Sequence, residues 1–485
     1  MASIAVTNNM IDATANSTRA LTLFFAGMNS SAPKEFPPSP VSSLSSHNVL
    51  GSRQIGLLPL IAVMYLTISG GAYGIEDAVA AGGPALTLLL CLLVPVAVSL
   101  PTALMAAELT ALLPIEGGFY FWVKEGFGSF AGFAEAYLTI LYTGVDMAIY
   151  PVLFAAYLSY LFPLRGLPAI LTAVAMVWGC GILNLLGIRL VGRASILLTI
   201  VLLAPFAGLI GIAIPSLAHW HLPAASVARG AGRMGALGAG LMVVIWNFCG
   251  WENLSVVAAE IKGAQRNYAR AVAVVLPLVV IGYILPLAAG TAVIADPRQW
   301  TTGAFAHIGE RLGGAYLGGA LAAGGMISAL AVFQAAMLWV SRMPFVLARE
   351  RFLPASLTRI WERQATPWMA IVASCVVCTL LLPLGFTALV TLDVTFYMAA
   401  LALEMAALVR LRRLYPGRVG LFVVGAGRLG LFLVVIAPMA VWIATFAVAV
   451  NGPQGKIQLL VAAILTMAVW PIYYLSRRFF GGPSG

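Results

Sequence analysis

Between Gly56 and Pro114 the chain contains neither Lys nor Arg, and most of the residues there are apolar. A helix that crosses a bilayer once needs about 20 apolar residues, so this stretch far exceeds a single crossing. Inside lipid, backbone N–H and C=O groups must find partners within the protein, and a helix provides them within one segment. The stretch therefore predicts membrane-spanning α-helices.

The composition of the whole chain extends this prediction. Of its 485 residues, 61% are hydrophobic and only 9% are charged. Soluble domains carry about 25% charged residues, so this chain cannot build a water-facing surface of the required size. Its 49 glycines suit close helix packing in lipid. We expect one all-α integral membrane domain. No nucleophile–base set or metal cluster is found at the interface, so an enzyme is not expected.

The apolar segments divide into twelve predicted spans, and basic residues are distributed unequally around them. With a cytoplasmic N-terminus, 21 of the 27 Lys and Arg residues fall in inner segments and 6 in outer loops. This bias predicts that both termini are cytoplasmic. It also accounts for the net charge of +10 without a nucleic-acid partner. The spans are residues 56–81, 84–112, 129–161, 167–187, 194–216, 235–260, 270–294, 313–341, 366–382, 386–408, 429–451 and 457–476.

Residues 1–50 are rich in Ser, Pro and Asn and predict a disordered cytoplasmic tail. The five cysteines fall in or beside apolar spans and indicate no disulfide framework. Cys375 and Cys378 have the spacing of a zinc site but no His nearby, so we expect neither a metal nor a cofactor.

Two spans have polar or glycine-rich interruptions near their middle. Ser69–Gly74 places three glycines within six residues of the first span, and Asn247–Glu252 interrupts the sixth. Each glycine weakens a helix by about 1 kcal/mol relative to alanine. Interruptions at matching positions of two five-span halves are typical of transporters built from inverted repeats. Glycines that only permit close helix packing are the alternative explanation.

Acidic residues are the only charged residues within the predicted spans. A charge at the bilayer centre costs at least about 2.5–3.5 kcal/mol and marks a functional site by default. Without basic partners, these carboxyl groups must be protonated, bonded to backbone donors or matched by a mobile cation. All three conditions fit transport of positively charged cargo. The nine acids are Glu76, Asp77, Glu108, Glu135, Asp146, Glu252, Glu260, Asp393 and Glu404.

The acids near the cytoplasmic ends of spans have a simpler explanation. There Lys262, Arg410 or water would compensate the charge, and Glu135, at the start of the third span, is similar. These residues are therefore expected to be structural. The three at the ends are Glu108, Glu260 and Glu404.

Asp146 lies near the centre of the third span, with Tyr142 and Tyr150 four residues away on the same helix face. It is either a structural hydrogen-bond node or the site of a substrate amine or proton. Glu252 lies at the interruption of the sixth span, where freed backbone can line a cavity. We consider both as proton carriers.

Glu76 and Asp77 follow the first interruption and would stabilise the positive end of a new half-helix, or else Glu76 is a third proton-coupling candidate. Asp393 lies about seven residues into the tenth span, with Phe396 and Tyr397 adjacent.

At these residues the chain resembles the amino acid–polyamine–organocation superfamily, and in particular its polyamine-uptake and amino acid permease branch. The resemblance extends in order from about residue 53 to 480. The stretches that carry it are SGGAYGIEDAV (Ser69–Val79), PIEGGFYFWVKEGFG (Pro114–Gly128), GVDMAIYPVL (Gly144–Leu153), WNFCGWENLSVVAAE (Trp246–Glu260) and ARERFLP (Ala348–Pro354).

The resemblance implies a twelve-helix permease domain over residues 51–480. Helices 1 and 6 would be broken and two C-terminal helices added. Repeat one would cover about 56–216, repeat two about 235–408 and helices 11–12 about 429–476.

The resemblance also implies a substrate site at the two breaks. Backbone amides of Ser69, Gly70 and Gly71 would receive a substrate carboxylate, with Tyr73 beside them. Asp146 would be the amine partner. The second break would hold the amino group and gate the side chain, through Phe248, Cys249, Gly250, Trp251 and Glu252.

Two positions depart from the family pattern. Leu202 stands where many relatives carry a lysine in the fifth span, and Ala336, with Gln334 nearby, stands where plant polyamine members carry an acid. The first departure weakens a lysine-based proton mechanism and the second weakens a polycation site.

The sequence thus predicts a plasma-membrane uptake permease for amino acids or polyamines, coupled to a proton or sodium ion. The substrate-site residues would be Ser69, Gly70, Gly71, Tyr73, Asp146, Tyr150, Phe248, Cys249, Gly250, Trp251, Glu252, Asp393 and Phe396. A cationic amino acid or amine exchanger and a membrane amine sensor that does not transport remain the alternatives.

Overall fold

The computed structural model describes residues 55–481 apart from residues 116, 187–192, 219, 221–231, 362–365, 417–426 and 451–454. The predicted tail, residues 1–50, lies outside the described part. The described residues form helices joined by short connections, without a β-strand. Two isolated β-bridges join Ile55 to Ile261 and Trp361 to Thr366.

Nine helical segments in the described part are long and apolar enough to cross a membrane. They are Pro84–Leu112, Ser129–Leu161, Leu167–Leu185, Ile196–Ala218, Ala264–Val293, Ala304–Arg349, Phe386–Leu414, Leu429–Val448 and Lys456–Phe480. Three shorter apolar helices, Leu57–Ile68, Met234–Asn247 and Trp368–Leu384, accompany them. The prediction of an all-α membrane protein is confirmed by these segments.

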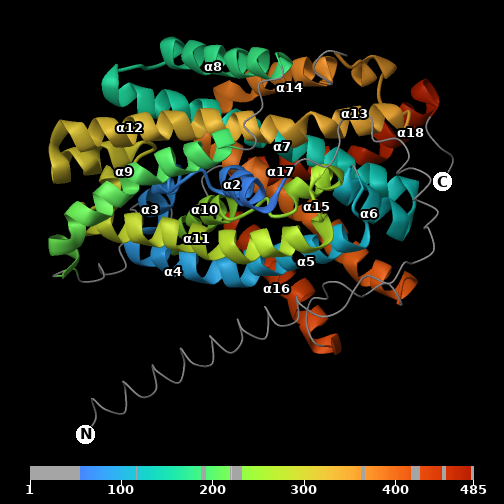
Figure 1. The fold of residues 1–485 in the computed structure, drawn as a ribbon, viewed down its shortest axis with the longest axis horizontal. Helices are drawn as coiled ribbons and strands as arrows, with labels where there is room; N and C mark the ends of the chain where they lie inside the picture. Colours follow the sequence, from blue (N-terminus) through green and yellow to red (C-terminus); the bar gives the residue numbers. More distant parts are fainter. Residues whose placement is uncertain are drawn as a thin grey trace, which may run out of the picture.

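The helices that follow α2 run mostly along the long axis of the molecule (Figure 1). Their bounds are α2 Leu57–Ile68, α3 Glu76–Gly82, α4 Pro84–Val94, α5 Leu100–Leu112, α6 Gly118–Phe127, α7 Ser129–Leu161, α8 Leu167–Leu185, α9 Arg193–Ala218, α10 Gly232–Asn247, α11 Ala264–Val293, α12 Ala304–Val340, α13 Arg342–Arg349, α14 Trp368–Leu381, α15 Phe386–Leu414, α16 Gly427–Ala449, α17 Gly455–Met467 and α18 Val469–Phe480.

The long helix α7 is central to the packing. It contacts α12 and α15 over much of its length, while α10 packs against α3 and α15. In Figure 1, α8 and α14 lie along one side of the molecule, and α4 and α5 lie along the opposite side, with α2 and α10 between them. The outer helices expose large apolar side chains, among them Leu380 and Met467, as lipid-facing helices do.

Both predicted interruptions are present. Helix α2 ends at Ile68 and α3 begins at Glu76, with Gly70, Gly71 and Gly74 at positive φ between them. Helix α10 ends at Asn247, and a 3₁₀ helix, Asn253–Glu260, follows the turn at Gly250. Only glycine adopts such φ values at low cost, so these residues end the helices where the sequence places them.

Candidate functional site

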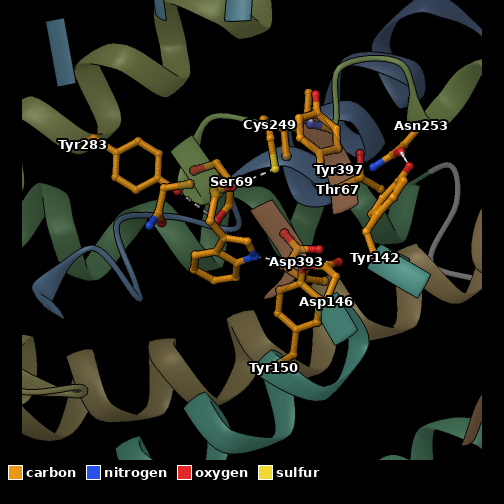
Figure 2. A pocket seen from close by; sticks show the side chains of 15 residues that line it. Thr67, Ser69, Tyr142, Asp146, Tyr150, Cys249, Asn253, Tyr283, Asp393 and Tyr397 are labelled. Carbon is orange, nitrogen blue, oxygen red and sulfur yellow. Dashed lines mark hydrogen bonds between the residues drawn. The ribbon is translucent and has the colours of Figure 1, made fainter. Parts of the chain in front are cut away.

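A small cavity of about 30 Å³ lies where the two interruptions meet α7, α11, α12 and α15. Space of this size holds about one or two water molecules, so a small organic substrate would need the surrounding helices to move apart. Figure 2 shows its polar side chains converging from several helices. The lining residues are Thr67, Ile68, Ser69, Tyr142, Asp146, Tyr150, Trp246, Asn247, Cys249, Gly250, Asn253, Tyr283, Val332, Asp393 and Tyr397.

Asp146 is the carboxylate of the cavity whose oxygens are occupied. The Tyr150 hydroxyl lies 3.0 and 2.9 Å from its Oδ1 and Oδ2, and the Trp246 indole N–H donates to Oδ1 at 2.9 Å. Tyr142 instead donates to Asn253 Oδ1 at 3.0 Å. Asp146 is therefore a hydrogen-bond node that orients two aromatic rings and still lines the cavity.

Asp393 is the second carboxylate of the cavity, and it is held differently. Its side chain is 1% exposed, yet Oδ1 has no hydrogen-bond partner. It interacts electrostatically with Asp146, and Figure 2 shows the two residues adjacent. No Lys, Arg or His is among the lining residues. An open oxygen on a buried acid, beside a second acid, suits an ammonium group because charge-assisted hydrogen bonds are the strong ones.

The backbone amides of the first interruption already have acceptors. The amides of Ser69 and Gly70 donate to the Tyr65 carbonyl at 2.9 and 3.3 Å, and the Gly71 amide lies 3.2 Å from Ser69 Oγ. The Gly70 carbonyl accepts from the Ser328 hydroxyl at 2.5 Å. In this structure the break is thus satisfied internally and presents no free amide of these three residues to a substrate carboxylate.

The second interruption is held by aromatic hydroxyls. The Gly250 amide donates to the Tyr397 hydroxyl at 3.3 Å, and that hydroxyl donates to Glu252 Oε2 at 3.1 Å. Tyr268 donates to the Trp251 carbonyl at 2.6 Å. These contacts join the break to α15 and α11 and fix the cavity wall.

Six of the residues expected at the substrate site line the cavity: Ser69, Asp146, Tyr150, Cys249, Gly250 and Asp393. Seven do not, and they lie in the surrounding core: Gly70, Gly71, Tyr73, Phe248, Trp251, Glu252 and Phe396. Tyr73 packs on Phe206 and Tyr157, and Phe248 packs on Tyr283. These side chains support the breaks, while their neighbours contact the cavity.

Several lining residues were not among the expected site residues, including Trp246, Asn253, Tyr283 and Tyr397. Two of them have a sequence signal. Tyr397 lies four residues after Asp393 and so shares its helix face, and Trp246 immediately precedes the second interruption. Tyr283, on α11, has no such signal.

Glu76 starts α3 and bonds to the break itself. The Gly74 amide donates to its Oε2 at 2.6 Å, and Tyr157 donates to its Oε1. Asp77 accepts from Thr302 at 2.8 Å. These contacts agree with acids that stabilise the start of a half-helix.

Four acids near the ends of spans were expected to be compensated by a basic residue or by water. This expectation is right for two of them and wrong for the other two. Glu108 pairs with Arg412, and Glu260 pairs with Arg342 rather than with Lys262. Glu404 and Glu135, however, are 1% and 0% exposed and each keeps an oxygen without a hydrogen-bond partner. Helix packing, which the sequence pattern does not report, encloses both.

The Glu108–Arg412 pair yields a stability prediction. Arg412 donates through two nitrogens, at 2.6 and 2.5 Å, to a carboxylate that is 5% exposed. Arg412→Leu should cost about 3–5 kcal/mol because it removes both of these charge-assisted hydrogen bonds from a buried carboxylate. The melting temperature of the purified protein in detergent should therefore fall. Adding Glu108→Gln should restore most of the loss, and a double variant as unstable as the single one would contradict this explanation.

No group of three or more His, Cys, Asp and Glu in the described residues is placed to hold a metal ion.

A chain whose described residues form nine candidate spans, two broken helices and a buried acidic cavity is a multi-pass membrane protein. Residues 55–472 match the family model described as amino acid permease, so the chain belongs to that family, within the amino acid–polyamine–organocation superfamily.

Similar proteins are transporters by name. The chain is 32% identical to "Polyamine transporter RMV1" of Arabidopsis thaliana over 80% of this chain and 79% of that protein. It is 32% identical to "Polyamine transporter PUT1" of Oryza sativa over 75% of this chain and 68% of that protein. An "Arginine/ornithine antiporter" of Latilactobacillus sakei is 26% identical over 69% of this chain and 73% of its own length.

Proposed function

We propose that this protein is a secondary active transporter that imports small organic amines, polyamines or amino acids, across the plasma membrane with a coupled cation, preferably a proton. The observation that carries the proposal is the cavity at the two helix breaks, which contains two carboxyl groups and no lining base. Such a cavity attracts positive charge. Acidic side chains at the middle of a membrane are costly to bury, so they indicate a site that binds transported cations rather than a purely structural feature.

The proposal includes the finer architecture. It has twelve helices, two inverted repeats over about 56–216 and 235–408, and two further helices over about 429–476. Both termini are cytoplasmic. In this arrangement the two breaks are equivalent positions of the repeats and meet at the bilayer midplane.

Within the two substrate classes, the site favours cations without a carboxylate. A zwitterionic amino acid needs donors for its carboxylate, and the amides of Ser69, Gly70 and Gly71 are engaged within the protein. A diamine needs acceptors, which Asp146 and Asp393 supply. Names of the plant relatives agree with this preference. Asp393 binds one ammonium group, and Tyr150, Trp246 and Tyr397 present aromatic faces or hydroxyls to the same cation.

Uptake into proteoliposomes tests this function. We expect labelled putrescine to accumulate under an imposed proton gradient, and labelled amino acids to accumulate less. Omitting sodium should not change the result if the coupling ion is a proton. Vesicles without protein are the control. If neither amine class accumulates under a proton or a sodium gradient, the proposal of coupled uptake is contradicted.

The relative named an arginine/ornithine antiporter favours a second function, exchange of cationic amino acids or amines. Preloaded unlabelled amine should then accelerate uptake of labelled amine without any ion gradient. Cationic amino acids carry the ammonium groups that the cavity suits, so this function uses the same residues. Binding without flux in either assay would instead indicate an amine sensor.

A further inference from the structure

The acids of α7 and α15 are arranged in two layers. Glu135 and Asp146 lie eleven residues apart on α7, and Asp393 and Glu404 lie eleven residues apart on α15. Eleven residues make about three helical turns, or roughly 16 Å, so both acids of each helix share one face. Asp146 interacts with Asp393 and Glu135 with Glu404. The two helices therefore present one acidic layer at the cavity and another about three turns away.

Glu252 joins the second layer from the break of the sixth span. It interacts electrostatically with Glu135 and Glu404, and also with Asp393 of the first layer. We call Glu135, Glu252 and Glu404 the carboxyl triad. None of the three lines the cavity.

The carboxyl triad is sealed from solvent and incompletely bonded. Its members are 0%, 0% and 1% exposed. Thr139 donates to Glu135 Oε1 at 2.7 Å, and Tyr397 donates to Glu252 Oε2. One oxygen of each residue has no hydrogen-bond partner: Glu135 Oε2, Glu252 Oε1 and Glu404 Oε2. An unsatisfied buried polar atom costs about 1–3 kcal/mol and more if charged, so three such atoms on neighbouring acids disfavour the state in which all three are ionised.

Among the described residues, the groups that interact electrostatically with the triad carry no positive charge. Four tyrosines interact with its members, namely Tyr120 of α6, Tyr142 of α7, Tyr268 of α11 and Tyr397 of α15, and Asp393 adds a further acid. No ion pair of the described part includes a triad residue. Because isolated buried charges are too costly to persist, at least one carboxyl group must be neutralised.

A proton is the cation that this site fits. A metal ion would need the carboxylates to converge on one point, and no described acid cluster is placed to do so. A substrate ammonium group would have to pass the wall formed by Gly250, Asn253 and Tyr397. A proton needs no space of its own and can be held by any of the three open oxygens.

We propose that Glu135, Glu252 and Glu404 form a proton-binding site separate from the substrate cavity, and that it binds the proton that drives uptake. This inference rests on the proposed function. Glu252 connects the two sites through Tyr397, whose hydroxyl also accepts from the Gly250 amide of the cavity wall. Separation of the broken helix from α7 and α15 would expose the triad and release its proton. The oxygens of Asp146 and Glu76 already accept hydrogen bonds from other groups. We therefore assign Asp146 to substrate binding and Glu76 to stabilising the start of α3.

Two partial reactions of putrescine transport in proteoliposomes test the proposal. Glu135→Gln and Glu404→Gln each mimic the protonated acid and should fold. We expect accumulation under a proton gradient, and putrescine-dependent proton entry measured with an internal pH dye, to fall about 10-fold or more. Counterflow of putrescine needs no net proton movement. The putrescine concentration for half-maximal counterflow should therefore change little. Glu310→Gln, at an exposed acid of α12, is the matched control and should behave as the wild type.

A spectroscopic measurement keeps the proposal testable if transport activity is low. The wild-type protein should show an infrared band of a protonated carboxyl group that shifts with pH, and the band should weaken in Glu404→Gln. Unchanged proton entry in both Gln variants, or an unchanged band, would overturn the triad site. Failure of the wild type to take up or exchange any amine would contradict the proposed function instead.

Discussion

Asp393→Asn should raise the putrescine concentration for half-maximal uptake by about 30-fold or more. The Asp393 carboxylate is buried and has an open oxygen, so it is the acceptor available to an ammonium group. Loss of one partner of a desolvated charge pair costs about 2–5 kcal/mol, which corresponds to this range. The measurement is uptake of labelled putrescine against concentration in proteoliposomes.

Comparison with other Asp variants separates this role from general effects. Asp296→Asn, at an exposed acid that caps a short 3₁₀ helix, should leave uptake unchanged because Asn caps as well as Asp. Asp393→Asn itself should not lower the melting temperature, since it removes an uncompensated buried acid. If Asp393→Asn has the same putrescine concentration for half-maximal uptake as the wild type, the amine binds elsewhere.

Gly70→Ala should nearly abolish transport and lower the melting temperature. Gly70 has φ +61°, and a Cβ there would lie 2.5 Å from Val332 Cγ2 and 2.7 Å from Ser328 Oγ. The left-handed conformation costs a non-glycine residue about 1–2 kcal/mol. Overpacking adds typically about 1–3 kcal/mol. Because Val332 lines the cavity and Ser328 bonds to Gly70, the strain would move the cavity wall.

Gly211→Ala is the matched control for this variant. Gly211 lies within α9, and a Cβ there would meet nothing within 4 Å. Alanine is the better helix former, so this change should be neutral or stabilising. Thermal unfolding in detergent and putrescine uptake would measure both variants. Equal behaviour of the two would contradict the requirement for glycine at position 70.

The expected helices, the two interruptions and the acids at membrane depth could be read from local sequence. Span 129–161 matches α7 at both ends, and the breaks at Ser69–Gly74 and Asn247–Glu252 fall where the glycines stand. Long apolar runs and glycines act within a single segment, because bilayer thickness and backbone sterics need no distant partner.

The residues that line the cavity were predicted less well than the helices and their interruptions. Six of the expected site residues line the cavity, and Tyr283, which also lines it, comes from a helix with no distinguishing motif. Tyr73, Trp251 and Phe396 have the right position in sequence, but their side chains pack into the core. A helix can turn about its axis without any change in its own pattern, so the side that faces the cavity depends on its neighbours.

By itself, the sequence determined that this chain builds apolar helices, breaks two of them and places acids at their depth, because each property depends on residues a few positions apart. Only the tertiary structure decided which acids are paired. Arg412 reaches Glu108 across 304 positions of the chain, while Glu135, Glu252 and Glu404 come together from three segments without a base. Charge compensation depends on distance in space, and that distance is set when the helices pack.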